Sequence, residues 1–400
     1  MTAIANWNSH TLSQLATINY GKSPANILAE DGDYPVVGTG GVERSGIDFV
    51  HDGDSIILGR KGTIDRVHFV SGRFWTIDTA YYLTDFCEAT PLWLYYFLQS
   101  LDLRRMNEAT GVPSLSRDLL YKIKIPTPPT LEQSKIAEIL STVDRASEQT
   151  EALIAKQQRL KTGLMQDLLT RGIDAEGNLR TEQTHEFKDS PLGRIPVEWE
   201  VKPIESKLEC IIDYRGRTPV KTDSGVPLIT AKNVRDGYLC EDPPEFIATE
   251  SFDSWMTRGI PAAGDVMITT EAPMGNVARV PVYQIALAQR LITLPTKKDE
   301  LASDFLFWSL HWSQTLERLK LLTSGSTVVG IKQSVFRRVE FSFPPLKEQL
   351  MIAKILNAEK SASESIHMQL SKLHSLKTSL MQDLLTGRKR VSNLLASGAI

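Results

Sequence analysis

PPTLEQSKIAEILSTVDRASEQTEALIAKQQRLKTGLMQDLLT, residues Pro128–Thr170, is the stretch that decides the fold. It recurs 216 residues later as PPLKEQLMIAKILNAEKSASESIHMQLSKLHSLKTSLMQDLLT, residues Pro344–Thr386. The two copies align without a gap and are identical at 22 of 43 positions, which chance does not produce. Because the period is far longer than that of a solenoid repeat, the chain is a duplicated half-molecule.

Each copy has the pattern of one long helix. The opening Pro-Pro pair cannot lie inside a helix and marks its start, and no proline follows it within the copy. At 1.5 Å per residue, about 40 helical residues span roughly 60 Å. Apolar residues at spacings of 3, 4 and 7 form one stripe, which needs a cover of similar length. We predict that the two helices pair antiparallel and leave room for helices of a partner, the alternative being a plain structural coiled coil. The stripe residues expected to pack the helices or bind a partner are Ile136, Leu140, Val143, Leu160, Leu164, Leu168, Ile352, Leu356, Leu376, Leu380 and Leu384.

The regions before the helices repeat more weakly. Gly53–Ile57 parallels Gly264–Ile268, and Trp7 matches Trp199. Short β-type runs broken by glycine fill both regions, and an aromatic helical stretch follows in each. The sequence therefore predicts an α+β fold, with two β-rich domains separated by a pair of long antiparallel helices and a pseudo-two-fold internal repeat. The expected segments are a first domain 1–127, a helix 128–172, a polar surface linker 173–195, a second domain 196–343, a helix 344–388 and a tail 389–400.

Composition points to an ordinary globular chain. The 400 residues carry a net charge of −3, so any binding to nucleic acid must rely on local basic groups or on a partner. The three cysteines form no CxxC pair, which gives no sign of a zinc site or a disulfide framework. The N-terminal residues lack a signal-peptide pattern, and the most apolar run is far too short to span a bilayer. We expect a cytoplasmic protein.

Motifs for catalysis are missing from the sequence. No GxxxxGK[ST] phosphate loop, no HExxH and no metal-ligand cluster of histidines occurs. Asp242–Glu245 reads Asp-Pro-Pro-Glu, which lacks the aromatic residue that an amino-methyltransferase stacks on its flipped base. We therefore predict no catalytic residues and no metal site. Two alternatives stay open: a structural coiled-coil hub without a DNA role, and a self-sufficient DNA-modifying enzyme.

The duplicated motifs resemble those of the DNA-specificity subunits of type I restriction–modification systems, over nearly the whole chain. The resemblance rests on PPxxEQ followed by IAxIL at each helix start, on LMQDLLT at each helix end, and on Leu192–Pro196 with Trp199 before the second domain. It implies that two target-recognition domains each read half of a bipartite DNA site and that the helices set the spacing between the halves. It also implies two methyltransferase subunits that carry S-adenosylmethionine and methylate adenine, and separate restriction–translocase subunits that use ATP and Mg. The chain itself would bind no cofactor and work as a non-catalytic, nucleoid-associated subunit in a bacterium or archaeon.

Candidate DNA contacts centre on Gly59–Gly62, which reads Gly-Arg-Lys-Gly between two strand-like runs. Glycine allows close backbone approach, while arginine and lysine can grip guanine or phosphate. Resembling domains carry such a loop on the DNA-facing side, although a solvated hairpin is the alternative. The equivalent stretch, Thr269–Gly275, has no basic pair, so we expect the two half-sites to differ. Loops 110–114 and 323–327 precede the helices and are either backbone-contacting or plain loops. The full set of candidates is Lys22, Arg60, Lys61, Thr63, Arg66, Ser114, Arg215, Arg217, Lys221, Lys232, Asn233, Arg235, Ser324 and Thr327.

Overall fold

The structure is a computed structural model that describes residues 7–216, 218–323 and 330–391. It divides into two compact units, Met1–Leu153 with Ile366–Ile400 and Ile154–Ser365. Each unit therefore contains one β-rich domain, part of one long helix and part of the other. The predicted fold class is confirmed, since both domains are mixed α and β and both long helices are present.

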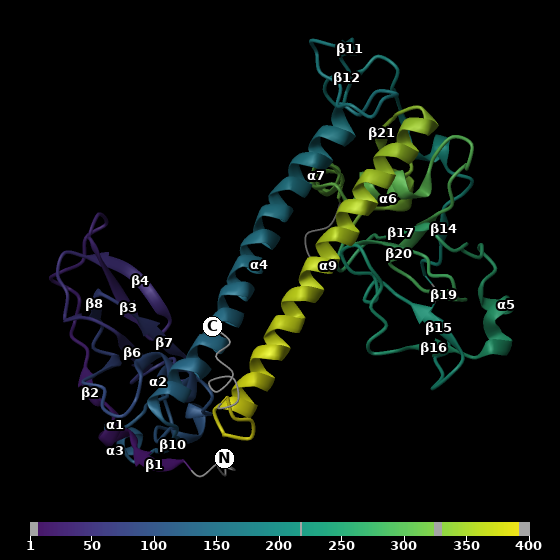
Figure 1. The fold of residues 1–400 in the computed structure, drawn as a ribbon. Helices are drawn as coiled ribbons and strands as arrows, with labels where there is room; N and C mark the ends of the chain where they lie inside the picture. The colour runs from purple at the N-terminus through teal and green to yellow at the C-terminus, as the bar shows by residue number, and fades with distance from the viewer. Residues whose placement is uncertain (1–6, 217, 324–329, 392–400) are drawn as a thin grey trace. The chain divides into compact units, whose positions relative to one another are not determined.

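In the first unit, two four-stranded sheets and a strand pair build the domain. One sheet has the order β2-β9-β6-β7, and the other has the order β4-β3-β8-β5. β1 pairs with β10 just before the long helix, and the two lie together in Figure 1. The strands are β1 (Asn8–Thr11), β2 (Thr17–Tyr20), β3 (Tyr34–Gly38), β4 (Gly41–Gly46), β5 (His51–Asp52), β6 (Ser55–Gly59), β7 (Val67–Val70), β8 (Arg73–Thr76), β9 (Ala80–Thr84) and β10 (Lys124–Thr127). The helices are α1 (Leu12–Leu15), α2 (Pro91–Gln99), the 3-10 turn Leu103–Met106 and α3 (Arg117–Tyr121).

The second unit repeats this plan. Its four-stranded sheet has the order β14-β20-β17-β18, which matches β2-β9-β6-β7 strand for strand. The strands are β11 (Phe187–Lys188), β12 (Ile195–Pro196), β13 (Glu200–Pro203), β14 (Ile212–Asp213), β15 (Val226–Ile229), β16 (Phe246–Ile247), β17 (Val266–Thr269), β18 (Val277–Arg279), β19 (Ala286–Leu287), β20 (Leu291–Leu294) and β21 (Glu340–Phe343). The helices are the 3-10 turns Ile204–Lys207 and Thr249–Ser251, α5 (Phe252–Trp255), α6 (Ser303–His311), α7 (Ser313–Leu321) and α8 (Gln333–Phe336).

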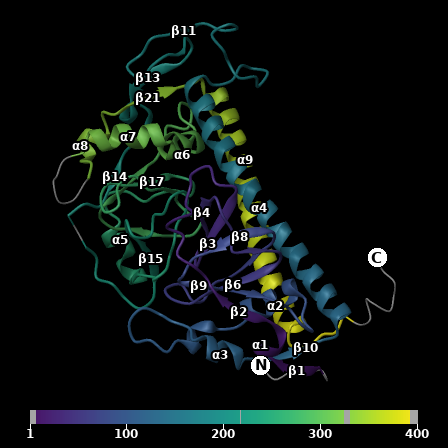
Figure 2. The ribbon, with the colours of Figure 1, turned by 90° about the vertical axis from the view of Figure 1, so that its left-hand side faces the viewer.

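Two further pairings show how closely the domains correspond. In the first domain β3 pairs with β8 in parallel, and in the second β15 pairs with β19 in parallel. Directly before each long helix, four residues of β1 pair with β10 and four of β13 pair with β21. In the second unit, β13 and β21 lie at the end of the helices where α4 ends and α9 begins (Figure 2). The predicted match of Gly53–Ile57 with Gly264–Ile268 corresponds to the strands β6 and β17.

The long helices are α4 (Thr130–Thr170) and α9 (Leu346–Leu384). Each begins directly after its Pro-Pro pair, as proline requires. In the first unit, Asp144 of α4 pairs with Lys377 of α9, and Glu151 of α4 lies beside His374 of α9. Residue numbers therefore rise along one helix while they fall along the other. The predicted antiparallel pairing is therefore present. In the second unit, Leu168 of α4 shares a core with the start of α9.

Burial of the apolar stripe is concentrated where each helix touches a β-rich domain. Most of the predicted stripe residues are buried or packed against a core. Leu160 and Leu376 depart from the prediction, with exposed fractions of 54% and 47%. Over these stretches most helix positions are exposed, because no domain core covers them. Of the two roles predicted for these leucines, their exposure excludes packing within the chain, and partner binding stays a prediction. The residues that are buried or packed are Ile136, Leu140, Val143, Leu164, Leu168, Ile352, Leu356, Leu380 and Leu384.

The segment predicted as a polar surface linker is partly buried. Ile173 and Ile195 belong to the core of the second unit, and Arg180 is also buried. Composition misled the prediction because the buried residues are few and lie between exposed polar ones. The segment is therefore part of the second unit's packing.

Candidate nucleic-acid interface

The Gly-Arg-Lys-Gly loop of the first domain is held firmly by its neighbours. The amides of Arg60 and Lys61 donate to the carbonyl of Thr79 at 2.9 and 3.0 Å, and the amide of Gly62 donates to Pro113 at 2.9 Å. Gly59 has no room for a side chain, because a Cβ would lie 2.0 Å from the carbonyl oxygen of Thr63. The backbone of the loop is thus fixed by hydrogen bonds to two other segments, whether its side chains contact DNA or solvent.

Two loops that the sequence suggested separately form one surface. Lys61 pairs with Ser114 as an isolated β-bridge, and the amide of Leu115 donates to the carbonyl of Arg60 at 3.0 Å. Loop 110–114 therefore lies directly against the Gly-Arg-Lys-Gly loop. Ser114 and Thr63 are half-buried at this junction, while the side chains of Lys61 and Arg66 are exposed.

An exposed tyrosine orients two arginines beside these loops. The guanidinium groups of Arg60 and Arg117 lie 5.3 and 4.9 Å from the ring centre of Tyr20, within the range of cation–π attraction. Arg60 also donates from Nη1 to the carbonyl of Asp78 at 2.9 Å. Lys22, two residues after Tyr20, is exposed. Sequence reasoning missed Tyr20 and Arg117, because only the fold brings β2 and α3 beside the loop.

The second domain holds an equivalent loop with different side chains. The amide of Thr270 donates to the carbonyl of Arg290 at 2.9 Å, and the amide of Ile331 donates to Thr270 at 3.0 Å. Glu271 forms an isolated β-bridge with Gly330, as Lys61 does with Ser114. Thr270 thus stands where Arg60 stands, and Glu271 stands where Lys61 stands. The stretch that lacks a basic pair in the sequence is therefore equivalent in backbone to the Gly-Arg-Lys-Gly loop and differs from it in charge.

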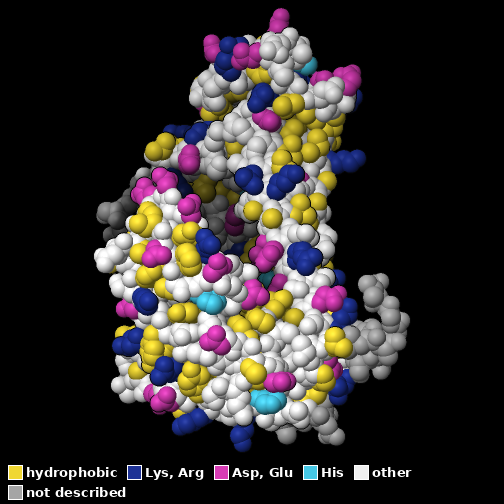
Figure 3. Space-filling model, turned by 60° about the vertical axis from the view of Figure 1, so that its left-hand side comes forward, with side chains coloured by type: hydrophobic (Ala, Val, Ile, Leu, Met, Phe, Trp, Pro, Cys, Tyr) yellow, Lys and Arg dark blue, Asp and Glu magenta, His cyan; other side chains and the backbone are white. Residues whose placement is uncertain are grey.

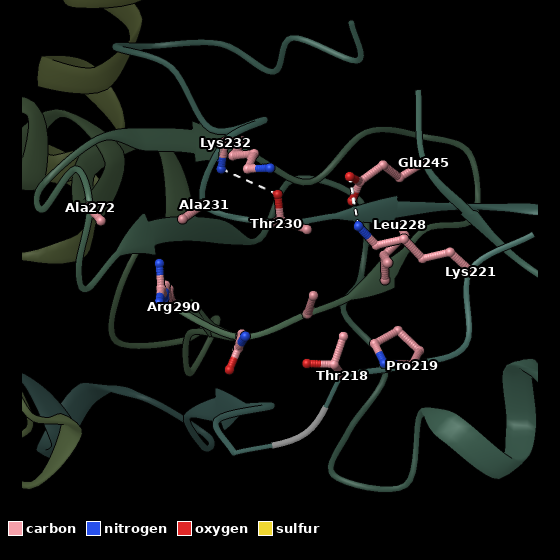
Figure 4. Close-up of a pocket in the computed structure, with 12 residues that line it drawn as sticks. Thr218, Pro219, Lys221, Leu228, Thr230, Ala231, Lys232, Glu245, Ala272 and Arg290 are labelled. Atoms are coloured by element: carbon pink, nitrogen blue, oxygen red, sulfur yellow. Dashed lines mark hydrogen bonds and ion pairs between the residues drawn. The ribbon is translucent and has the colours of Figure 1, made fainter. Parts of the chain in front are cut away.

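Two predicted basic residues of the second domain line one pocket of about 240 Å³, Lys221 and Lys232 (Figure 4). Lys221 forms an ion pair with Glu245 at 2.7 Å, which neutralises its charge. Lys232 is exposed. Arg290 lines the same pocket and was missed by the sequence, where it stands alone between apolar runs.

The remaining candidates of the second domain differ in accessibility. Arg235 is exposed, and Arg215 is half-buried with Nη2 donating to the carbonyl of Ile331 at 3.4 Å. Asn233 is only 5% exposed, and its amide accepts from Thr230 and donates to the carbonyl of Cys240. Its side chain is buried and held within this turn, so the prediction that Asn233 contacts DNA is wrong for this structure. Arg217, Ser324 and Thr327 lie outside the described residues.

The Glu-Gln pair of each PPxxEQ motif fixes the start of its helix. Gln133 accepts from the amide of Thr90 at 2.7 Å and donates to the carbonyls of Glu88 and Pro128 at 2.8 and 2.9 Å. Gln349 repeats this pattern, accepting from Ala302 and donating to Glu300 and Pro344. Each glutamine therefore ties the β-rich domain of its own unit to the first turn of a long helix.

Each motif glutamate binds an arginine from the segment that follows the other helix. In the second unit, Glu348 is bridged by both terminal nitrogens of Arg180 and accepts from the indole of Trp199. In the first unit, Glu132 accepts from Arg390, whose guanidinium lies 5.5 Å from the ring centre of Trp7. The sequence showed the glutamates and tryptophans but gave no signal for their arginine partners.

The surface view agrees with a chain of nearly balanced charge. On the face drawn in Figure 3, basic and acidic side chains are interspersed. Within the described residues, no group of three or more His, Cys, Asp or Glu side chains is placed to hold a metal ion. Among the described helices, none has the length and apolar character needed to cross a membrane.

A family comparison matches the duplicated plan. The family model of the type I restriction modification DNA specificity domain matches residues 4–157 and 196–373. The chain belongs to this family. The two matched stretches of the specificity family begin before each β-rich domain and run into each long helix, so the internal repeat consists of two copies of one specificity domain.

Named relatives carry the same assignment. The chain is 26% identical over 315 residues to the type I restriction enzyme MjaVIII specificity subunit of Methanocaldococcus jannaschii, covering 76% of this chain and 71% of the relative. It is 22% identical over 231 residues to the EcoDI specificity subunit of Escherichia coli, covering 52% and 51%. The fold matches a crystal structure of the type I restriction–modification S subunit from M. genitalium with a TM-score of 0.66 at 16% identity, covering 96% of this chain and 99% of that one. Membership of the specificity family favours the DNA-binding interpretation over a structural hub or a self-sufficient enzyme.

Proposed function

We propose that this chain gives a type I restriction–modification complex its DNA specificity, with each domain reading one half of an asymmetric bipartite site. One observation carries the proposal. One four-stranded sheet has the same strand order in both domains, yet the equivalent loop is Arg60-Lys61 in the first and Thr270-Glu271 in the second. A protein that recognises two different DNA sequences with two domains of one fold needs different side chains on equivalent loops, because base edges are distinguished by side-chain donors and acceptors.

The helices α4 and α9 serve as the spacer and as the docking site for two methyltransferase subunits. Leu160 and Leu376 occupy equivalent positions of the repeat, and both are exposed. A repeated surface in one chain offers the same contact to two copies of one partner, which is the logic of symmetric assemblies. A second chain packed on each helix would cover leucines that the chain itself leaves in solvent.

The chemistry of the complex resides in the partners. The methyltransferase subunits supply S-adenosylmethionine and modify adenine, and the restriction subunits supply ATP- and Mg-dependent translocation and cleavage. This chain binds no cofactor and provides the DNA address in the cytoplasm, at the nucleoid. Basic residues of the partners share the phosphate contacts, which accounts for a specificity subunit with a net charge of −3.

Methylome sequencing tests the proposal. Cells that express the chain together with its methyltransferase should show modified adenines in one bipartite, non-palindromic motif, and cells without the chain should lose that motif. The purified chain alone, given S-adenosylmethionine or ATP, should neither methylate nor cleave DNA. Turnover by the chain alone, or a methylome that does not depend on it, would contradict the proposal.

Matched insertions test the spacer role of the helices. Glu151 of α4 faces His374 of α9, and the helices are antiparallel, so four residues inserted after Glu151 and four inserted before His374 should keep the two helices in register. Four helical residues add roughly 6 Å, close to two base pairs at about 3.4 Å each. We expect both half-sites unchanged and the spacer longer by one or two base pairs. A variant that binds its methyltransferase and keeps the original spacer would show that the helices do not set it.

A further inference from the structure

Arg290 occupies an unusual place in the second domain. Its φ of +70° is in the left-handed region, which glycine tolerates and side chains with a Cβ rarely adopt. The carbonyl of Arg290 accepts from the amide of Thr270, which fixes the turn before β20 to the loop after β17. A glycine would satisfy this backbone without strain, so the presence of an arginine here points to a use for its side chain.

The charge of Arg290 is largely uncompensated. Its side chain is 53% exposed, and its ion pair with Glu271 is long, at 3.9 Å. Lys221 of the same pocket is neutralised by Glu245 at 2.7 Å. Among the described residues that line this pocket, Arg290 and Lys232 are therefore the cations that are available to a ligand.

The pocket around Arg290 suits the edge of a base. Thr218 and Thr230 add hydrogen-bonding side chains to its lining and Leu228 adds an apolar one (Figure 4). Gln289 and Ala288 also line the pocket. An arginine guanidinium binds the paired acceptors of a base edge in a bidentate way, and guanine offers such a pair in the major groove. Lysine, a point charge on a flexible stem, suits a phosphate.

The corresponding place in the first domain is held by Thr79. The carbonyl of Thr79 accepts from Arg60 and Lys61, as that of Arg290 accepts from Thr270. In the first domain the basic groups thus lie on the loop after β6, and in the second domain the arginine lies on the facing turn before β20. The two domains therefore carry their basic groups on opposite members of one hydrogen-bonded loop–turn pair.

We propose that Arg290 determines the specificity of the second domain by contacting acceptor atoms of a base in the second half-site, with Lys232 on an adjacent phosphate. This inference rests on the proposed function and deepens it. It names the turn before β20, in place of the loop after β17, as the element that reads sequence in the second domain.

The test uses two substitutions in the complex with methyltransferase. Arg290→Gly removes the guanidinium and relieves the left-handed backbone, so the variant should fold at least as well as the parent protein. Arg290→Lys keeps the charge and loses the bidentate geometry. The control is Lys298→Ala, which also removes one positive charge from an exposed side chain of this unit, outside the pocket.

Methylomes and DNA affinities at several salt concentrations are the readouts. We expect Arg290→Gly to relax one position of the second half-site, leave the first half-site intact and weaken cognate binding by about 5- to 150-fold. Arg290→Lys should relax the same position while the salt dependence stays unchanged, and Lys298→Ala should alter neither half-site.

Two results would overturn the inference. One is an unchanged second half-site in Arg290→Gly. The other is uniform weakening with the salt slope reduced by about 1, which marks a phosphate contact. Failure of the proposed function itself looks different, because the parent protein would then direct no bipartite modification at all.

Discussion

The two β-rich domains share a frame and differ in what they present on it. Four strands follow the same order in both domains. Equivalent backbone hydrogen bonds hold the loop that follows β6 in the first domain and the loop that follows β17 in the second. On that frame the first domain places Arg60 over the ring of Tyr20 and leaves Lys61 exposed, whereas the second has a buried Thr270 and a half-buried Glu271 at the equivalent positions. The comparison teaches that one strand order and one set of backbone hydrogen bonds can carry loops of different side-chain charge.

The largest difference in stability should appear between the two glutamate–arginine pairs at the starts of α4 and α9. Glu348 and Arg180 are 7% and 9% exposed, so Glu348→Gln leaves a buried guanidinium without its charge partner, at a cost of about 3–5 kcal/mol. Arg390, the partner of Glu132, is 40% exposed and regains water, so Glu132→Gln should cost about 1–3 kcal/mol. Denaturant unfolding followed by tryptophan fluorescence measures both. Equal losses of unfolding free energy in the two variants would show that burial of the arginine does not make one glutamate–arginine pair stronger than the other.

The next effect concerns the basic loop of the first domain. Arg60→Ala with Lys61→Ala should weaken DNA binding by the assembled complex, by about 1–3 kcal/mol for a lost base contact and with a salt slope lower by about 1 for each lost phosphate contact. The matched control is Thr270→Ala with Glu271→Ala at the equivalent positions, which removes no positive charge and should leave the salt slope unchanged or steeper. Binding titrations at two or more salt concentrations decide the outcome. Unchanged affinity in the first variant would mean that the loop does not face DNA.

A smaller effect should come from the helix positions next to α2 and α6. In the first unit Lys377 lies over the ring of Tyr96 and pairs with Asp144 at 2.7 Å. The equivalent positions of the second unit are Lys161, over Trp308, and Lys360 in place of the aspartate. Burial lowers the pKa of Lys360, and nearby Arg279 and Lys161 lower it further, while the ion pair with Glu364 at 3.8 Å acts in the opposite direction. Lys360 and Lys161 are thus two cations that repel one another.

Replacing Lys360 by the residue of the first copy should relieve that repulsion. Lys360→Asp gives Lys161 a partner and should raise the free energy of unfolding by about 0.5–1 kcal/mol, the usual range for a partly exposed ion pair. The reverse change, Asp144→Lys, should lower it by a similar amount or more. Thermal unfolding of both variants measures the pair. A stability loss in Lys360→Asp would show that the bond from Lys360 to the carbonyl of Gly237 matters more than the repulsion.

Much of the frame was predictable, because duplication and helical periodicity are properties of the sequence itself. The Pro-Pro pairs and the apolar spacing located both long helices, and repeated Gly-Asp segments located β6 and β17. Accessibility was harder to predict. Leu160 and Leu376 continue the stripe in sequence, but they are exposed because no domain core covers that length of helix.

The candidate DNA contacts were predictable only where basic residues are adjacent in the sequence. Arg60 and Lys61 stand together between glycines, which made the loop visible. Arg290, Arg117 and Arg180 each stand apart from other basic residues, and their roles arise from contacts with segments far away in the chain. Asn233 looked like a reader of DNA, but its amide completes a turn with Thr230 and Cys240. Such roles depend on tertiary pairing, which a single sequence does not encode locally.

Exchange of the second domain for a copy of the first tests the central claim most directly. Replacing Glu200–Phe343 by Asn8–Thr127 puts the β1–β10 pair where the β13–β21 pair stands, with four residues in each strand, and keeps Trp199 and the Pro-Pro pair of α9. The methylome of cells expressing this chain with its methyltransferase should show a symmetric bipartite motif, the first half-site followed by its inverted copy. A chain that assembles and still directs the original asymmetric motif would contradict the account, because the second half-site would then be read outside the second domain.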